Sequence, residues 1–176
     1  VTLAGADSEV AKQARQVFAS EAGDTLVWGT DLRMGAAQAA ILNGIAAHAL
    51  ELDDTGGCDH SGAVVLPAVM AAVSMQTEPV NGRELITAVV IGYDVSRRVL
   101  EACGGYSAHN GAGWHSTATC GVFGAAAASA RILGLDAAQT VSALGIAGSF
   151  SGGLWAFIHD GSQSKKLHSG RAAEGG

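Results

Sequence analysis

A cluster of side chains capable of acid–base or metal chemistry lies within one short stretch of a weakly charged chain. The stretch contains His48, Glu51, Asp53, Asp54, Thr55, Asp59 and His60, although only 15% of the 176 residues are charged. Its flanks, residues 41–50 and 63–73, are apolar enough to be buried. Burial on both sides would place the carboxylates and imidazoles at the mouth of a core, where their pKa values shift. The alternative is a solvated helix–loop–helix turn built on Gly56 and Gly57.

Two later segments could complete such a site. One is Gly113-Trp114-His115-Ser116, and the other carries the concentrated basic residues of an acidic chain, namely Lys165, Lys166 and Arg171 with His168. Backbone N–H groups at a helix start would add to the attraction for anions. If the segments converge, they suit proton abstraction beside a carboxylate, with cations holding the substrate's acid groups. The alternatives are ordinary buried histidines and lysines on a solvated helix face.

Helical patterns must position these segments, because no strand alternation persists long enough to build a sheet. In the first half of the chain, local signals predict a helix capped by Asp7 and ending near Ala22, a loop at 23–34 with a short extended piece, and helices at 35–50 and from Ser61. A further helix runs from the Asn81–Glu84 capping box to Cys103, and a glycine-rich loop follows at 104–113. The second half is predicted to contain a long helix from His115 to Gly134, a helix from the Asp136–Gln139 capping box to Phe150, a loop at 152–164 and a last helix from about Lys165. We therefore predict one all-α domain over residues 1–176.

Composition narrows the class of protein. Hydrophobic residues make up 48% of the chain and aromatic residues 5%, which favours helices packed closely through small side chains. The net charge of −6 argues against a general nucleic-acid or anionic-membrane surface. Residues 111–130 and 137–158 lack charge and approach membrane-spanning length. They are rich in Gly, Ala, Ser and Thr, so we expect buried helices rather than membrane spans.

The cysteines suggest in which compartment the protein occurs, and the chain ends suggest that the sequence is a fragment. Cys58, Cys103 and Cys120 form no CxxC pair, which favours a reducing compartment without a disulfide framework. No basic leader precedes an apolar segment at the start, so we expect a cytoplasmic protein. The chain starts at Val1 and ends inside a helical pattern, so we expect a piece of a longer protein.

Three separated motifs resemble the MmgE/PrpD family, whose members include 2-methylcitrate dehydratase, cis-aconitate decarboxylase and iminodisuccinate epimerase. The motifs are HALELDDT with HSGAVVLPA, GWHSTATCGVFGAAAASARILGL and DGSQSKKLHSGRAA. They occur in the family's order, and the resemblance runs from about Gly5 to the end. It implies part of a large helical domain, a homodimer, and an α+β lid domain that is absent from this chain.

The resemblance carries over position by position. Glu51 stands where the family has Asp and is followed by Asp53, Asp54 and Thr55. His60 matches the histidine of a His-Pro-Ser motif that lacks its proline here, Gly113-Trp114-His115 matches Gly-Phe-His, and residues 164–168 match Thr-Lys-Arg-Leu-His. Glu51 is one methylene longer than the family's Asp, and the loop at 56–58 departs from the dehydratase pattern. Both differences bear on the substrate.

The resemblance implies a cofactor-free lyase or isomerase that acts on a di- or tricarboxylate, most closely a 2-methylcitrate dehydratase. The implied catalytic residues are Glu51, His60, His115 and Lys165, and the implied substrate-binding residues are Asp53, Asp54, Thr55, Lys166, His168 and Arg171. We take His115 as the proton carrier because imidazole titrates near neutral pH. No metal is expected, and the fragment alone is expected to be inactive because proton-transfer groups would lie on the lid.

Two other functions compete with this interpretation. A metal-dependent hydrolase could use His48, Glu51, Asp54 and His60, although their spacing matches no HExxH signature and His48 is expected to face the core. A non-catalytic helical dimerisation module would also suit the small-residue helices. Metal analysis tests the first, and turnover of citrate-like acids tests the second.

Overall fold

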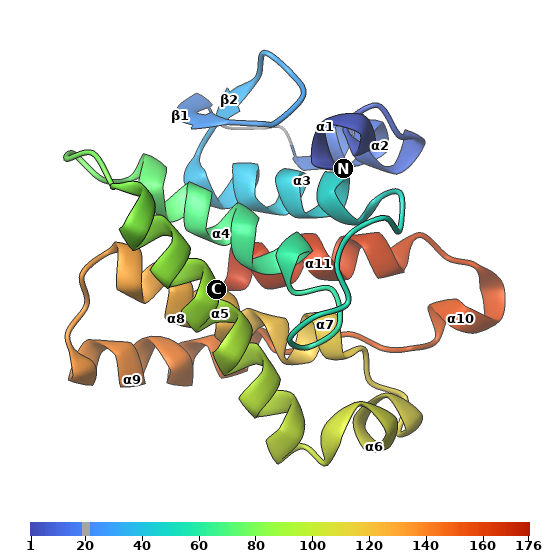
Figure 1. Ribbon diagram of the computed structural model, residues 1–176. Coiled ribbons are helices and arrows are strands. Elements are labelled where there is room, and N and C mark those ends of the chain that lie inside the picture. The colour runs from blue at the N-terminus through green and yellow to red at the C-terminus, as the bar shows by residue number, and fades with distance from the viewer. Residues whose placement is uncertain (19–21) are drawn as a thin grey trace.

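The computed structural model describes residues 1–18 and 22–176, and these form a helical domain (Figure 1). In chain order the elements are α1 (Thr2–Gly5), α2 (Glu9–Phe18), β1 (Ala22–Leu26), β2 (Arg33–Met34), α3 (Ala36–His48), α4 (Gly62–Ser74), α5 (Gly82–Ala102), α6 (Gly105–Gly111), α7 (Ser116–Thr119), α8 (Gly121–Ile132), α9 (Ala137–Ala147), the 3-10 turn η1 (Gly148–Phe150), α10 (Phe157–Asp160) and α11 (Ser164–Gly175). The predicted helical class is confirmed. The expectation that no sheet forms is wrong in one place, where β1 and β2 pair antiparallel.

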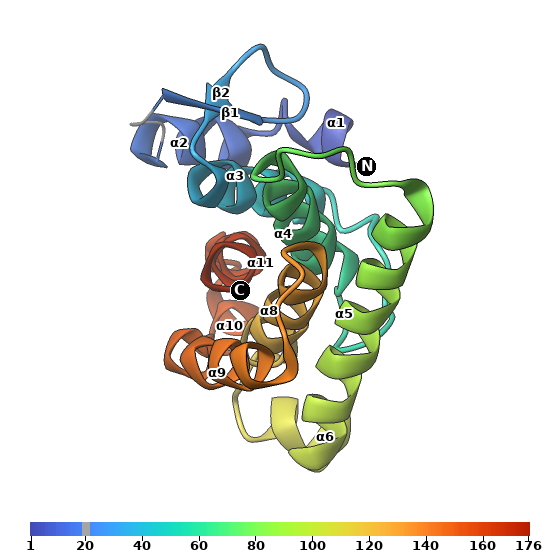
Figure 2. The ribbon, with the colours of Figure 1, turned by 90° about the vertical axis from the view of Figure 1, so that its left-hand side faces the viewer.

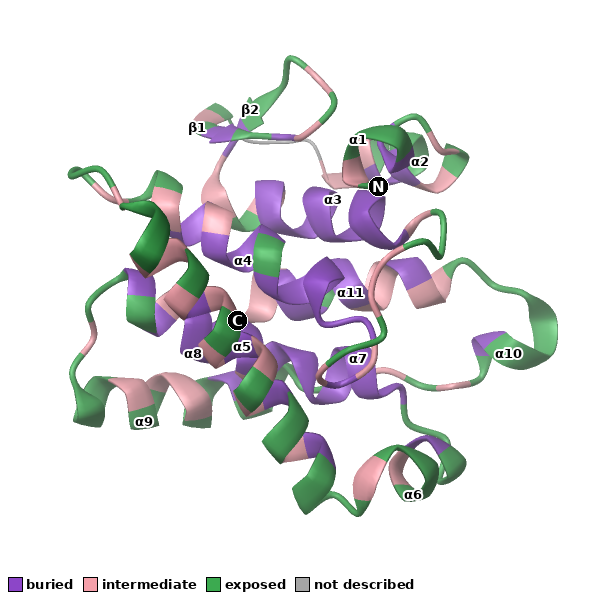
Figure 3. Ribbon diagram, in the orientation of Figure 1, coloured by how far each residue is buried: buried purple, intermediate pink, exposed green. Residues whose placement is uncertain are grey.

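The core lies between α3, α4, α8 and α11, which pack against one another in the middle of the molecule (Figure 2). Helices α3, α4 and α8 are apolar or small on nearly every side, and Figure 3 colours most of their residues as buried. Helix α11 is more polar and buries mainly its small residues, together with Lys166. Glycine lets α3 and α11 approach closely, because a Cβ on Gly44 would lie 2.8 Å from the Cα of Gly170. This crossing fixes the position of the basic first turn of α11 relative to the end of α3.

Three local signals place helix ends as predicted. The Asn81 side chain accepts a hydrogen bond from the Glu84 N–H at the start of α5, and Asp136 forms a full capping box with Gln139 at the start of α9. Gly134, at φ 68°, terminates α8. The N–H groups of residues 134 and 135 donate to the carbonyls of Arg131 and Ala130, the pattern of a Schellman motif.

The predicted first helix is wrong at its start. The Ser8 hydroxyl, rather than Asp7, accepts from the Ala11 N–H, and α2 begins at Glu9. Of the predicted end near Ala22, residues 19–21 lie outside the described residues, and Ala22 itself opens β1.

Three further segments differ from their predictions. The glycine-rich segment 104–113 forms α6, because Gly104 takes a left-handed conformation that starts the helix after α5 ends. The helix predicted after His115 is divided at Cys120 into α7 and α8. The expected loop 152–164 includes the short helix α10.

The two uncharged segments behave differently. Helices α7 and α8 are largely buried, which confirms the prediction for the helix after His115, whereas residues 111–114 are exposed. The prediction for 137–158 is wrong, because α9 lies on the surface and Val141 and Ile146 are 71% and 62% exposed. Without charged residues, the sequence of α9 does not reveal which face packs on α8. Among the described helices, none combines the length and the apolarity needed to cross a bilayer.

Candidate active site

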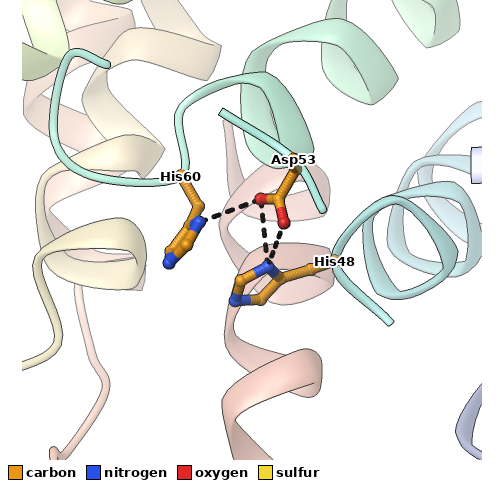
Figure 4. Close-up of side chains that lie close together, drawn as sticks. All are labelled: His48, Asp53 and His60. Carbon is orange, nitrogen blue, oxygen red and sulfur yellow. Dashed lines mark hydrogen bonds and ion pairs between the residues drawn. The ribbon is translucent and has the colours of Figure 1, made fainter. Parts of the chain in front are cut away.

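The acidic turn between α3 and α4 is organised by a network of three side chains (Figure 4). The Nδ1 atoms of His48 and His60 each lie 3.0 Å from Asp53 Oδ2. His48 is the last residue of α3, and His60 precedes α4. The apolar helices on both sides therefore deliver the two imidazoles to one carboxylate, as the buried flanks predict.

The two imidazoles differ in their preferred charge. Burial lowers the pKa of His48, although the hydrogen bond to Asp53 opposes this. Burial also disfavours charge on His60, but the hydrogen bond to Asp53 and the nearby Asp59 carboxylate outweigh it and raise the pKa. Burial would raise the pKa of Asp53, yet the hydrogen bonds from both imidazoles hold it below its ordinary range.

The hydrogen-bond partners fix the tautomer of His60. Its Nδ1 faces two acceptors, the Asp53 carboxylate and the carbonyl of Asp54 at 3.1 Å, so Nδ1 carries the hydrogen. Nε2 is left as the nitrogen that can gain or release a proton, and it lies 3.5 Å from Asp59 Oδ2. His60 is therefore held in one orientation with one free proton-transfer position.

A second group joins the acidic turn to α11. Glu51 Oε2 lies 2.7 Å from Lys165 Nζ, and Glu51 Oε1 contacts Lys166 Nζ. Glu51 adopts a φ of 55°, which is uncommon for a residue with a side chain. Burial lowers the pKa of both lysines. The three side chains line a pocket of about 300 Å³ whose wall includes Phe157, so two lysines paired with one carboxylate lie at the wall of this pocket.

His115 and His168 form a third group beside this pocket. Their Nδ1 atoms lie 3.0 Å apart, and the His115 ring packs against Trp155 and Phe157. His115 is completely buried, and this burial, assisted by nearby His168, lowers its pKa to about 2. His115 is therefore a neutral imidazole near pH 7. It does not line the Lys165 pocket, but α7 and α11 pack together and place it within electrostatic reach of Lys165.

The remaining predicted site residues have different surroundings. Asp54 Oδ1 accepts from the Gly62 N–H and so anchors the start of α4, while Thr55 is exposed on the loop. The guanidinium of Arg171 stacks on Phe18 and pairs with Glu174 at 2.6 Å. These contacts give Asp54 a structural role and leave Arg171 outside the group around Lys165.

His48 was expected to face the core and was given no role in the lyase site. It is fully buried, as expected, yet its Nδ1 holds Asp53. The signal was present in the sequence, because a histidine at a helix end can reach back to a carboxylate in the turn that follows. Asp59 was named in the cluster but given no role, although it faces Nε2 of His60.

The sequence is similar to a known protein family along its whole given length. Residues 1–176 match the MmgE/PrpD N-terminal domain. The chain belongs to the MmgE/PrpD family. This agrees with the motif resemblance and with the helical fold, and it accounts for the order of the three polar segments along the chain.

Similar curated proteins come from fungi and animals. A cis-aconitate decarboxylase-like protein of Aspergillus oryzae is 38% identical over 96% of this chain and 36% of its own length. The cis-aconitate decarboxylase of Homo sapiens is 33% identical over 95% of this chain and 35% of its own length. That of Aspergillus terreus is 33% identical over 88% and 32%. The chain thus spans about a third of the length of these MmgE/PrpD relatives.

Proposed function

We propose that the protein is a lyase that decarboxylates a cis-aconitate-like tricarboxylate without a metal or organic cofactor. The observation that carries the proposal is the pair of partly buried ammonium groups, Lys165 and Lys166, with an oriented imidazole, His60, within electrostatic reach of Lys165. The names of the similar MmgE/PrpD proteins favour decarboxylation. For this reason we prefer decarboxylation to the dehydration of 2-methylcitrate, which remains the second candidate.

Binding would begin with exchange of one carboxylate for another. Glu51 pairs with both lysines, so an incoming carboxylate would displace it and take the two ammonium groups. Such an arrangement holds the acid in one orientation and stabilises negative charge that develops beside it. The chemical step needs only the breaking of one bond and the transfer of one proton. The main task of the protein is therefore to hold the substrate in the reactive orientation.

In the step that follows, the bond between carbon and a carboxylate breaks and CO₂ leaves. The electron pair shifts through the adjacent double bond, and the carbon at its far end takes a proton. His60 is better suited to supply this proton than His115, because its pKa is raised while that of His115 is lowered. A neutral His115 would instead act as a positioning residue, because it is buried and holds His168 on α11, the helix that carries both lysines.

Replacing Lys165 with Ala tests this proposal. Because this chain alone is expected to be inactive, the turnover assays use the full-length protein. We expect weaker binding and slower turnover of cis-aconitate, because one of the two ammonium groups is lost. The matched control is Lys12→Ala, which removes the same charge from an exposed position on α2. Parallel assays with 2-methylcitrate, citrate and iminodisuccinate identify the preferred acid. Activity that survives Lys165→Ala unchanged, or that disappears on treatment with EDTA, would contradict the cofactor-free mechanism.

We further propose that the protein forms a homodimer through its helical surface. The support is a set of exposed apolar side chains on α9 and the segment after it, Val141, Ile146, Phe150 and Leu154. Light scattering should give twice the chain mass, and a stable monomer at high concentration would argue against this assembly.

A further inference from the structure

The His48–Asp53–His60 cluster has the composition of a transition-metal site. One ring nitrogen from each histidine and one carboxylate oxygen lie within 4.8 Å of one another. We propose that these three residues bind one divalent transition-metal ion, with Zn²⁺ the best fit, and that the bound ion inhibits the enzyme by occupying His60. This inference goes beyond the proposed function, which uses no metal.

The distances between the two imidazoles and Asp53 would allow an ion to replace the two hydrogen bonds that join them. Both Nδ1 atoms lie 3.0 Å from Asp53 Oδ2 and point at it (Figure 4). In a tetrahedral zinc site, bonds of about 2.0–2.2 Å place neighbouring ligand atoms about 3.3 Å apart. The two observed nitrogen–oxygen distances are only a few tenths of an ångström shorter than this spacing, so an ion could replace the two hydrogen bonds.

The far nitrogens of the two rings supply an independent observation. When Nδ1 binds a metal, the ring hydrogen moves to Nε2, which then needs an acceptor. His48 Nε2 is buried without a hydrogen-bond partner among the described residues, and it lies 3.9 Å from Glu51 Oε1. His60 Nε2 lies 3.5 Å from Asp59 Oδ2. Carboxylates that face the outer nitrogen of a ligating imidazole are the usual second layer of zinc sites.

Ligand chemistry indicates which ions fit. Two imidazoles and one carboxylate suit Zn²⁺ and Co²⁺, whereas Mg²⁺ and Ca²⁺ prefer oxygen ligands throughout. Three protein ligands leave a fourth position for water or a substrate carboxylate. The acidic side chains of Glu51 and Asp59 offset the repulsion from the two nearby lysines. Because the ion would take Nδ1 of His60 and reorganise its hydrogens, it would remove the proposed proton donor from the reaction.

Cobalt titration of the purified protein tests the site directly, since Co²⁺ in such a site absorbs visible light. We expect saturation at one equivalent and displacement by Zn²⁺. Asp53→Asn and His48→Gln should each weaken binding by at least tenfold. Asp59→Asn, which alters only the second layer, should weaken it by about tenfold and is the variant least prone to disturb the core. Circular dichroism confirms that each variant is folded.

Two other histidines provide matched controls. His109 lies 4.0 Å from the Cys120 thiol, a competing pair of soft ligands, and His159 is exposed. His109→Gln and His159→Gln should leave the cobalt affinity unchanged. The inference is overturned if binding never saturates, if Asp53→Asn and Asp59→Asn bind cobalt as tightly as the parent protein, or if His109→Gln abolishes binding.

Turnover assays keep this inference separate from the proposed function. Zn²⁺ should inhibit turnover of cis-aconitate, and EDTA should restore it. Loss of activity with EDTA alone would overturn the cofactor-free mechanism while leaving the metal site standing. Turnover that is unaffected by Zn²⁺ at saturating occupancy would overturn the inhibitory role.

Discussion

Replacing Glu51 with Gln should strengthen the binding of an external carboxylate to the pocket. Glu51 lies 2.7 Å from the ammonium group of Lys165 and also contacts that of Lys166. A substrate that binds both lysines must first displace the Glu51 carboxylate. Glutamine keeps the shape of the side chain but removes its charge, so the lysines become available at lower cost.

The size of the effect follows from the exposure of the partners. The Glu51 side chain is 43% exposed, whereas those of Lys165 and Lys166 are 19% and 10% exposed. A fully exposed ion pair contributes about 0.2–1 kcal/mol, and a hydrogen bond to a charged group contributes about 1.5–3 kcal/mol. Because solvent screens Glu51 only in part, we expect about 1–2 kcal/mol, which corresponds to about 5- to 30-fold tighter binding.

Isothermal titration calorimetry with citrate, at neutral pH and low salt, measures this change. The matched control is Glu84→Gln, because Glu84 pairs with Arg131 at 2.7 Å on the exposed surface between α5 and α8. Both variants change the net charge equally, so a general electrostatic effect would appear in both. Citrate binding that is equal or weaker in Glu51→Gln would refute the idea that Glu51 competes with the substrate.

Three further changes test other parts of the structure. His115→Gln should lower turnover of cis-aconitate, because the buried imidazole holds His168 on the helix that carries Lys165 and Lys166; unchanged turnover in a folded variant would contradict this. Gly170→Ala should lower the unfolding free energy by about 1–3 kcal/mol through overpacking against α3, while Gly145→Ala, which meets nothing within 4 Å, should not destabilise the fold in thermal unfolding. Asp53→Asn should cost about 2 kcal/mol at pH 7. Since the pKa of Asp53 is lowered in the folded protein, this stabilisation is present above about pH 4 and lost as pH falls through the folded pKa, so urea denaturation should show the difference shrinking in acid.

The fold could be predicted where short-range chemistry determines it. Asn81, Asp136 and Gly134 end or start helices through contacts with residues only a few positions away, so the sequence contains the whole signal. The segment 104–113 was harder, because glycine composition indicates a loop while the observed helix depends on Gly104 turning the chain after α5. The exposure of α9 is a property of packing, and uncharged alanines and valines leave it undetermined.

The sequence brought candidate site residues together in one list but did not indicate how they pair. The motifs bring Glu51 and Lys165 into the same candidate list, yet nothing local indicates that Glu51 bridges two lysines across 114 and 115 positions of sequence. That contact depends on the close crossing of α3 and α11 at Gly44 and Gly170. Arg171, which follows the two lysines on the same helix by less than two turns, pairs with Glu174 instead.

The roles of the histidines depend most strongly on the tertiary structure. His60 and His115 are the same residue type, and both are buried, but burial acts without compensation on His115, whereas Asp53 and Asp59 compensate it at His60. The ordinary pKa of imidazole therefore predicts the pKa of neither histidine. A carboxylate supplied from a neighbouring turn decides which ring can hold a proton near neutral pH, and the same carboxylate gives that ring the surroundings of a metal ligand. If Asp53 creates both properties, Asp53→Asn should at once lower the pKa of His60, measured by NMR titration, and weaken cobalt binding. A variant that loses one property and keeps the other would separate the two roles.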